Sequence, residues 1–145
     1  GLRGAGTSAY AVKPDIAFAI DVTLANDVPG SKAADWGEKL GKGPSISVID
    51  GSLTPNPRLR DFVVDTAKEN EIPYQLGSLT GGGTDGGRIA LTAAGTPTLT
   101  LSIATRYIHA HNGILHSDDI DNLVKLLVAV IKKLDDKAVA HIRYQ

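Results

Sequence analysis

The sequence predicts a layered α/β fold with a mostly parallel sheet. Short apolar or β-branched segments of strand length alternate along the chain with segments whose apolar residues recur at helical spacing. The 145 residues contain no internal repeat, no low-complexity tract and no linker long enough to divide them. We therefore expect a single α/β unit, which at this length buries a core without disulfides or structural metal ions.

Two segments in the first third of the chain predict strands. Residues 16–22, IAFAIDV, form a near-continuous apolar run after a Lys-Pro-Asp turn, which is typical of a strand buried on both faces of a parallel sheet. Residues 45–50, SISVID, repeat this pattern after a Gly-Lys-Gly-Pro turn. Each run carries a carboxylate at or next to its end, Asp21 in the first and Asp50 in the second.

The middle of the chain predicts a helix, a short strand and a second, shorter helix. Asn56 is the expected N-cap of a helix that begins with a proline and ends near Asn70. Residues 74–79 are expected to form a short strand. The glycine-rich segment GGGTDGG then makes a turn, and residues 88–94 form a helix that Asp85 caps.

The last third predicts a strand and a long amphipathic helix. Residues 98–103 are rich in β-branched side chains, as strands are. Ser117 is the expected N-cap of the helix, and Asp118 and Asp119 lie where the positive end of the helix dipole favours anions. Apolar residues then recur at helical spacing as far as Leu134, which gives the helix one broad apolar face.

Polar residues gather where the predicted strands end. Asp21, Asp50 and the loop that begins at residue 106 all follow strands, and ligands of α/β sheets bind beyond the carboxyl ends of the strands. We therefore expect these groups to converge at one edge. Beside so apolar a run, Asp21 must be hydrogen-bonded, paired or metal-bound, because a lone buried charge is too unfavourable. Capping of the loop that follows is the alternative reading of this aspartate.

The segment RYIHAHNGILHSDD, residues 106–119, contains three of the four histidines of the chain. His109 and His111 are two residues apart, which in an extended segment places both side chains on one side. Imidazole is the commonest metal ligand, but a histidine after a strand also packs through ordinary hydrogen bonds. Spacing alone leaves both interpretations open. His116 is expected on the surface, ahead of the helix.

The composition excludes several classes of function. A net charge of -1, with 21% charged residues of both signs, provides no basic surface for nucleic acid or an anionic membrane. Without cysteine there is no disulfide, thiolate metal site or cysteine nucleophile. No apolar run approaches the roughly 20 residues that cross a bilayer, and no export signal is recognisable, so we expect a cytoplasmic protein. GGGTDGG lacks the spacing of nucleotide-binding motifs, and no G-x-S-x-G motif occurs.

Six segments, taken together and in order, resemble the tetrahedral aminopeptidases, also called glutamyl or deblocking aminopeptidases. Some members of this family carry the name cellulase or endoglucanase. The segments are GLRGA, AIDVTLANDVPG, LGKGPSISVID, IPYQ, GGGTDGG and RYIHAHNG. The resemblance covers nearly the whole chain. It implies a three-layer α/β/α, zinc-peptidase-like fold, of which residues 1–145 are the C-terminal portion of the catalytic domain.

The resemblance also implies a chemistry. Members of the family are metal-dependent aminopeptidases in which two divalent metal ions, zinc or cobalt, activate a water that releases N-terminal residues from peptides. Asp21 would bind one metal ion and His109 the other. The general-base glutamate is expected upstream of Gly1, so we expect these 145 residues alone to be inactive.

The expected substrate is a peptide, and we expect no nucleic-acid or membrane partner. Gly82, Gly83, Thr84 and Arg106 are expected to line the substrate site, because glycines allow close approach and an arginine binds carboxylate or carbonyl oxygens. Pairing with a buried acid is the alternative role of Arg106. The intact protein would form a homo-oligomer, which in many relatives is a dodecamer. Two other functions remain open, a non-catalytic α/β assembly or binding module and a glucan hydrolase.

Overall fold

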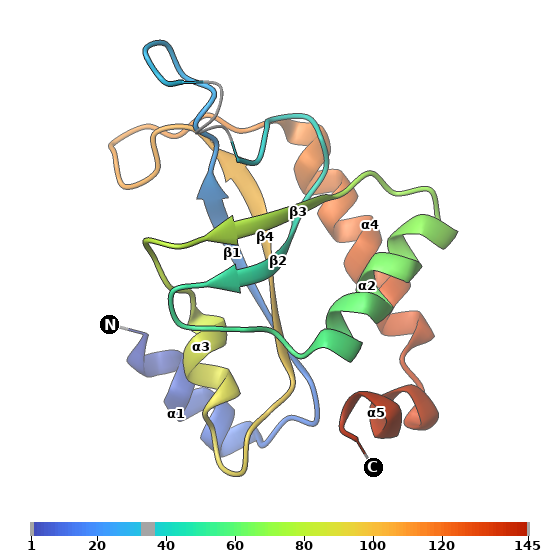
Figure 1. Cartoon of the computed structure of the whole chain (residues 1–145). Coiled ribbons are helices and arrows are strands. Elements are labelled where there is room, and N and C mark those ends of the chain that lie inside the picture. Colours follow the sequence, from blue (N-terminus) through green and yellow to red (C-terminus); the bar gives the residue numbers. More distant parts are fainter. Residues whose placement is uncertain (1, 33–36, 145) are drawn as a thin grey trace.

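The computed structural model describes residues 2–32 and 37–144, which contain five helices and four strands (Figure 1). In chain order the elements are α1 (Arg3–Val12), β1 (Ala17–Leu24), β2 (Ser45–Asp50), α2 (Pro57–Glu69), β3 (Gln75–Leu79), α3 (Asp85–Ala90), β4 (Thr98–Thr105), α4 (Ser117–Lys133) and α5 (Asp136–Ile142). None of the helices in these two ranges is both long and apolar enough to cross a membrane.

The four strands form one mixed sheet in the order β1-β4-β2-β3. β1 is parallel to β4 and β2 is parallel to β3, whereas β2 and β4 run antiparallel over a short contact at Ser45 and Ile46. Two of the three pairings are therefore parallel, as predicted. Because β2 and β4 run in opposite directions, the carboxyl end of β2 does not share an edge with those of β1 and β4. The expectation that Asp50 would join Asp21 at one edge is wrong for this reason.

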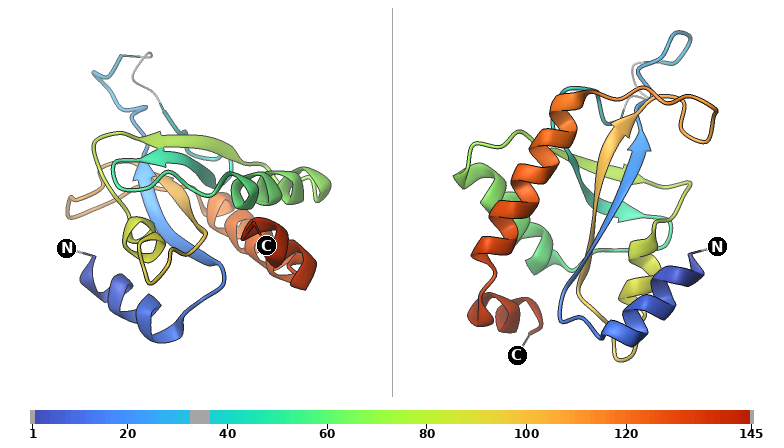
Figure 2. Two further views of the ribbon diagram at one scale, coloured as in Figure 1. Left: turned by 60° about the horizontal axis from the view of Figure 1, so that its bottom comes forward. Right: turned by 180° about the vertical axis from the view of Figure 1, so that it is seen from behind.

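Helices cover both faces of the sheet (Figure 2). α1 and α3 pack together on one face, where α3 also contacts β1 and β4. α2, α4 and α5 lie on the other face. This arrangement confirms the three-layer α/β/α architecture.

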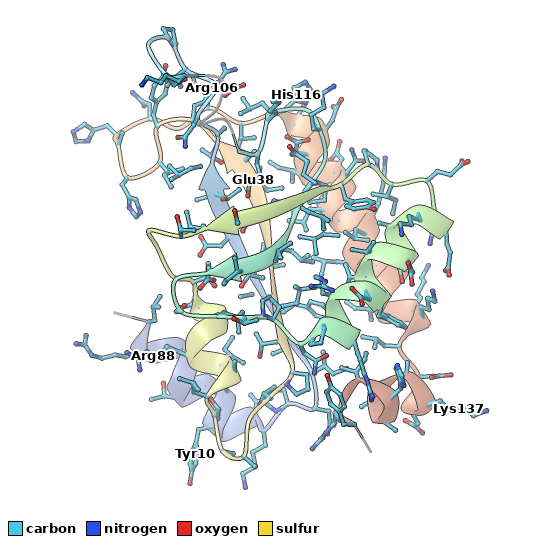
Figure 3. All side chains as sticks on the ribbon, viewed as in Figure 1. Tyr10, Glu38, Arg88, Arg106, His116 and Lys137 are labelled. Atoms are coloured by element: carbon cyan, nitrogen blue, oxygen red, sulfur yellow. The ribbon has the colours of Figure 1, made fainter. Side chains whose placement is uncertain are left out.

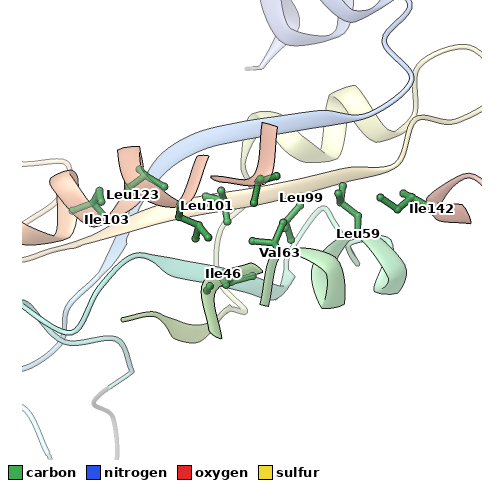
Figure 4. Close-up of a cluster of buried hydrophobic side chains, with 11 residues drawn as sticks. Ile46, Leu59, Val63, Leu99, Leu101, Ile103, Leu123 and Ile142 are labelled. Carbon is green, nitrogen blue, oxygen red and sulfur yellow. The ribbon is translucent and has the colours of Figure 1, made fainter. Parts of the chain in front are cut away.

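The apolar core lies between the sheet and the pair α2 and α4 (Figure 4). β4 contributes Leu99, Leu101 and Ile103 from alternate positions, and β2 contributes Ile46. The helical side of the core consists of Leu59, Val63, Ala67, Leu123, Leu126, Val130 and Ile142. Burial of each larger aliphatic side chain stabilises the fold by about 1.5–3 kcal/mol, so this cluster holds α2 and α4 to the sheet.

The opposite face of β4 is polar, although every residue of the strand is buried. Thr98, Thr100 and Ser102 alternate with the core residues, and the two-residue period of a strand places all three on one face. The Thr100 hydroxyl lies 2.8 Å from that of Thr84, which directly precedes α3. β4 therefore separates an apolar core from a polar interior on the α3 side.

β1 differs from its predicted environment. It is the edge strand of the described sheet and pairs only with β4, so Ile20 and Val22 remain 53% and 40% exposed. Asp21 is also exposed. The expectation of a strand buried on both faces, carrying a buried carboxylate, is therefore wrong.

Three helices differ from the prediction. α3 begins at Asp85 instead of residue 88, because the two glycines after Asp85 already belong to the helix. α1 and α5 were not predicted. α1 contains two glycines and buries only Ala9, and α5 has seven residues and buries only Ile142. Neither helix has the periodic apolar face that marks an amphipathic helix in a sequence.

The start of α4 has a different cap and a buried acid. The N-cap is His116 instead of the serine after it, and His116 Nδ1 accepts a hydrogen bond from the N–H of Asp118 at 3.2 Å. Asp119 is completely buried, and its carboxylate accepts hydrogen bonds from the N–H groups of Gly41 and Gly43 at 2.8 and 2.7 Å. Asp119 therefore ties the loop before β2 to α4, a role beyond dipole complementarity.

Candidate functional site

A cavity of about 890 Å³ opens at the carboxyl end of β1. Its walls come from the end of β1, the glycine-rich turn after β3 and the loop after β4, which are far apart in the sequence. Among the residues that line it are Asp21, Gly82, Gly83, Thr84 and His109. The fold therefore brings together all of the residues predicted for the site except Arg106.

Asp21 and His109 reach this cavity from different elements. The carboxylate of Asp21 is exposed on β1 and accepts a hydrogen bond of 2.8 Å from the N–H of Val22. His109 is exposed in the loop after β4, and its backbone has a φ of 61°. This left-handed conformation costs a non-glycine residue about 1–2 kcal/mol. The loop that carries His109 must therefore be held by other contacts.

Arg106 supplies those contacts at the base of the loop. Its backbone exchanges two hydrogen bonds with Ile114, of 2.9 and 3.1 Å. Its guanidinium forms a bidentate pair with Asp27, with two N···O distances of 2.8 Å. The hydrogen bonds from Arg106 lower the pKa of the Asp27 carboxyl, and Asp27 raises the pKa of Arg106 in return. Arg106 is thus engaged by an acid and is not among the residues that line the cavity.

The other histidines of residues 106–119, and Asp118, lie apart from the cavity. His111 is exposed and does not line it. His116 caps α4, as described above, and Asp118 is exposed at the first turn of that helix. Of the three histidines in the segment, His109 alone lines the cavity.

The donors at the cavity are of the right type for a divalent metal ion. Carboxylate oxygen and imidazole nitrogen are ligands that zinc and cobalt accept. Within residues 2–32 and 37–144, however, no three His, Cys, Asp or Glu side chains lie close enough to hold a metal ion together. Asp21 and His109 therefore fit as part of a ligand set, and by themselves they do not complete one.

The glycine-rich turn is shaped by its packing against the loop after β2. The carbonyl of Gly82 accepts a backbone hydrogen bond of 2.7 Å from the glycine that follows β2. A Cβ atom at Gly83 would lie 2.7 Å from Ser52 Oγ, closer than van der Waals contact allows. The hydroxyl of Thr84 donates to the Asp50 carboxylate at 2.8 Å. The two glycines thus present no side chain to the cavity and let two loops approach closely.

A second, smaller cavity adjoins the first, and most of the residues that line it have polar side chains. Its volume is about 10 Å³, room for about one water molecule. Two carboxylates line it, Glu38 and Asp50, and each residue is only 6% exposed. The residues that line both cavities are Thr23, Glu38, Ser78, Leu79 and Thr84.

Glu38 is a site residue that the sequence did not indicate. Its carboxylate accepts hydrogen bonds from the hydroxyls of Thr23 on β1 and Ser45 on β2, at 3.3 and 3.0 Å. The sequence before Glu38 shows no hydrophobic periodicity, so no local pattern indicates that this residue is buried. The alternation of hydroxyl and aliphatic residues in β4 was the available signal, because it predicts a polar face on a buried strand.

Comparisons with known proteins place the chain among aminopeptidases. A model of the M42 glutamyl aminopeptidase family matches residues 1–126. A putative aminopeptidase of Acetivibrio thermocellus is 47% identical over 131 residues, which cover 90% of this chain and 39% of the relative. The lysyl aminopeptidase of Pyrococcus furiosus is 38% identical, with 92% and 38% covered. The glutamyl aminopeptidase of Lactococcus lactis is 34% identical, with 99% and 39% covered. The chain therefore spans about two-fifths of the length of these relatives.

Solved structures share the fold. A TET aminopeptidase from a marine-sediment thaumarchaeon matches with a TM-score of 0.94 and 44% identity, over 98% of this chain and 40% of that one. The TET1 peptidase of Pyrococcus horikoshii, described as assembling into a tetrahedron or a large octahedral shell, matches with a TM-score of 0.73 and 34% identity, over 92% and 38%. A Thermotoga maritima protein named endoglucanase matches with a TM-score of 0.70 and 25% identity, over 95% and 39%.

Proposed function

Because the chain belongs to the M42 glutamyl aminopeptidase family, we propose that it is the C-terminal portion of the catalytic domain of a metal-dependent aminopeptidase. The proposed substrate is a peptide with a free N-terminus. The observation that carries this proposal is the cavity at the end of β1, which Asp21 and His109 both line although they are far apart in the sequence. A carboxylate and an imidazole at one cavity are the donor types that hydrolytic metal centres use.

In this proposal Asp21 binds one divalent metal ion and His109 binds a second, with zinc and cobalt as the candidate metals. When bound, such a pair polarises the scissile carbonyl and lowers the pKa of water. Among the described residues, only the N–H of Val22 donates to the Asp21 carboxylate, which leaves lone pairs for a metal ion. The remaining ligands and the general base would come from outside these 145 residues, in a protein as long as its relatives.

The glycine-rich turn and Arg106 have different proposed roles toward the substrate. Gly82 and Gly83 let the peptide main chain approach the wall of the cavity, because they carry no side chain there. Thr84 lines the same wall, but its hydroxyl is engaged by Asp50. Arg106 acts through the loop of His109, which it holds through Ile114 and Asp27.

We also propose that the whole protein is a homo-oligomer. A particle of twelve subunits is the first candidate for its oligomeric state. The assembly of the Pyrococcus horikoshii relative into a tetrahedron or octahedral shell supports this proposal. Light scattering on the purified protein measures the particle mass directly. A monomeric mass would contradict it.

The proposed function is tested by an activity assay of the full-length protein, as the cell produces it. Aminoacyl derivatives of aminomethylcoumarin should be hydrolysed, a chelator should abolish the turnover, and added zinc or cobalt should restore it. The matched control is the same derivative with an acetylated amine, which an aminopeptidase leaves intact. Hydrolysis of glucans without added metal would favour the glucan hydrolase instead, and peptide binding without turnover would favour the binding module.

A further inference from the structure

We infer that Glu38 selects substrates whose N-terminal side chain is positively charged, lysine above all. This inference rests on the proposed aminopeptidase function and adds the substrate class. Membership of the family does not decide the preference, because one relative is named a lysyl and another a glutamyl aminopeptidase. The charges that line the cavity do distinguish the two classes.

The charged side chains at the cavity are acidic. Among the described residues that line it, Asp21 and Glu38 are acids, and there is no lysine or arginine. Asp21 is assigned to a metal ion, so Glu38 is the charge that remains to meet a substrate side chain. Figure 3 shows Glu38 close to the carboxyl ends of β1 and β4, which agrees with its hydrogen bond to Thr23 of β1.

The Glu38 carboxylate lacks a counter-charge. It forms none of the ion pairs in the described part of the chain. Thr23 and Ser45 both donate to its Oε1 atom, and within the described residues no hydrogen bond reaches Oε2. A carboxylate that is only 6% exposed is unfavourable without a cation. A substrate ammonium group would supply that cation.

The space around Glu38 suits the end of a lysine side chain. A side chain at Gly77 would collide with the Glu38 carboxylate, so the glycine in β3 leaves room for it. The small cavity beside Glu38 holds a group the size of one water molecule, which an ammonium group matches. Val22, Leu24 and Leu79 line the larger cavity, and apolar walls of this kind pack the methylene stem of a lysine.

The same arrangement disfavours an acidic N-terminal residue. A glutamyl side chain in this position would bring a second carboxylate toward Glu38, and like charges at short range in a partly desolvated site repel strongly. An uncharged side chain of similar length would keep the apolar contacts and lose the ion pair. We therefore expect kcat/KM to fall in the order lysyl, norleucyl, glutamyl.

The experiment compares these three aminoacyl derivatives of aminomethylcoumarin on the full-length protein. Norleucine is the matched control for lysine, because it has a similar stem without the ammonium group. In the variant Glu38→Gln, the ratio of kcat/KM for lysyl over norleucyl substrate should fall by about 10- to 100-fold, as expected for the loss of a hydrogen bond to a charged group. Glu71→Gln makes the same chemical change at an exposed position and should leave the ratio unchanged.

The outcomes separate this inference from the function on which it rests. Absence of hydrolysis of every substrate would overturn both. If the wild-type protein hydrolyses the glutamyl or norleucyl substrate with the same kcat/KM as the lysyl substrate, the inference alone is overturned. This comparison needs only the wild-type protein, so it can be made even if Glu38→Gln fails to fold. A folded Glu38→Gln protein that keeps the wild-type ratio would also overturn it.

Discussion

Asp119 holds the loop before β2 against α4 through two hydrogen bonds to its buried carboxylate. Asp119→Asn removes the charge and replaces one of the two acceptor oxygens with an NH₂ group, which cannot accept a hydrogen bond from a backbone N–H. We expect this variant to lower the free energy of unfolding by about 2–3 kcal/mol, measured by urea denaturation. Asp118→Asn is the matched control, because Asp118 is exposed, and it should change stability by less than about 0.5 kcal/mol. Equal losses in the two variants would contradict the assigned role of Asp119.

The pair of Asp27 and Arg106 predicts a pH dependence with a definite sign. Hydrogen bonds from Arg106 lower the folded-state pKa of Asp27 below its ordinary value of 3.8. A carboxyl whose pKa is lower in the folded state contributes stability above its unfolded pKa, and loses it as the pH falls through the folded value. The stability difference between wild type and Asp27→Asn should therefore be present near pH 7 and shrink below about pH 4. A difference that stays constant from neutral to acidic pH would contradict this.

Single residues show what local sequence can and cannot predict about a site. Asp21 and His109 were predictable at one cavity because Asp21 lies near the carboxyl end of β1, His109 follows β4, and these two strands are parallel and adjacent. The exposure of Asp21 was not predictable, because it depends on β1 being an edge strand of the described sheet. Burial of Glu38 was also out of reach, because its partners Thr23 and Ser45 lie on two other elements.

Among the helices and strands, the predicted elements agree with the structure where the sequence has a long periodic apolar pattern or a clear capping residue. β2 has the predicted bounds, and α2 follows the predicted Asn56 cap, whose side chain accepts a hydrogen bond from the N–H of Leu59. α4 was predictable from its periodic apolar face. The antiparallel pairing of β2 with β4 was not predictable, because the direction of a strand depends on the path of its connections and not on its own residues.

The glycines of α1 and α3 are predicted to respond in opposite ways to alanine. At Gly87 in α3, a Cβ atom would lie 2.7 Å from the Cβ atom and 2.9 Å from the carbonyl oxygen of Ser52. We expect Gly87→Ala to lower the free energy of unfolding by about 1–3 kcal/mol. At Gly6 in α1 nothing lies within 4 Å of the added atom. Gly6→Ala should therefore raise the free energy of unfolding by about 0.5–1 kcal/mol.

Urea denaturation of both variants measures these changes. The pair controls for the chemical change itself, since each replaces a helical glycine by alanine. Stabilisation by Gly87→Ala would show that α3 does not pack against Ser52 as described, and destabilisation by Gly6→Ala would show that the described surface of α1 is covered.

At the scale of the whole molecule, these 145 residues supply only part of the proposed metal centre. Two candidate ligands line the cavity, no group of three is present among the described residues, and catalytic zinc sites usually have three protein ligands. We expect the 145 residues alone to release no measurable N-terminal residue from an aminoacyl anilide with added zinc or cobalt, whereas the full-length protein does. Turnover by the shorter chain at a rate near that of the full-length protein would contradict this division of the site.

The metal content of the full-length protein tests the central claim that Asp21 and His109 belong to one two-metal centre. Elemental mass spectrometry on purified wild type should find about two divalent metal ions per subunit. Asp21→Asn and His109→Ala should each lose at least one of them, while His111→Ala, which alters an exposed histidine outside the cavity, should retain both. Full metal content in folded Asp21→Asn and His109→Ala proteins would contradict the account.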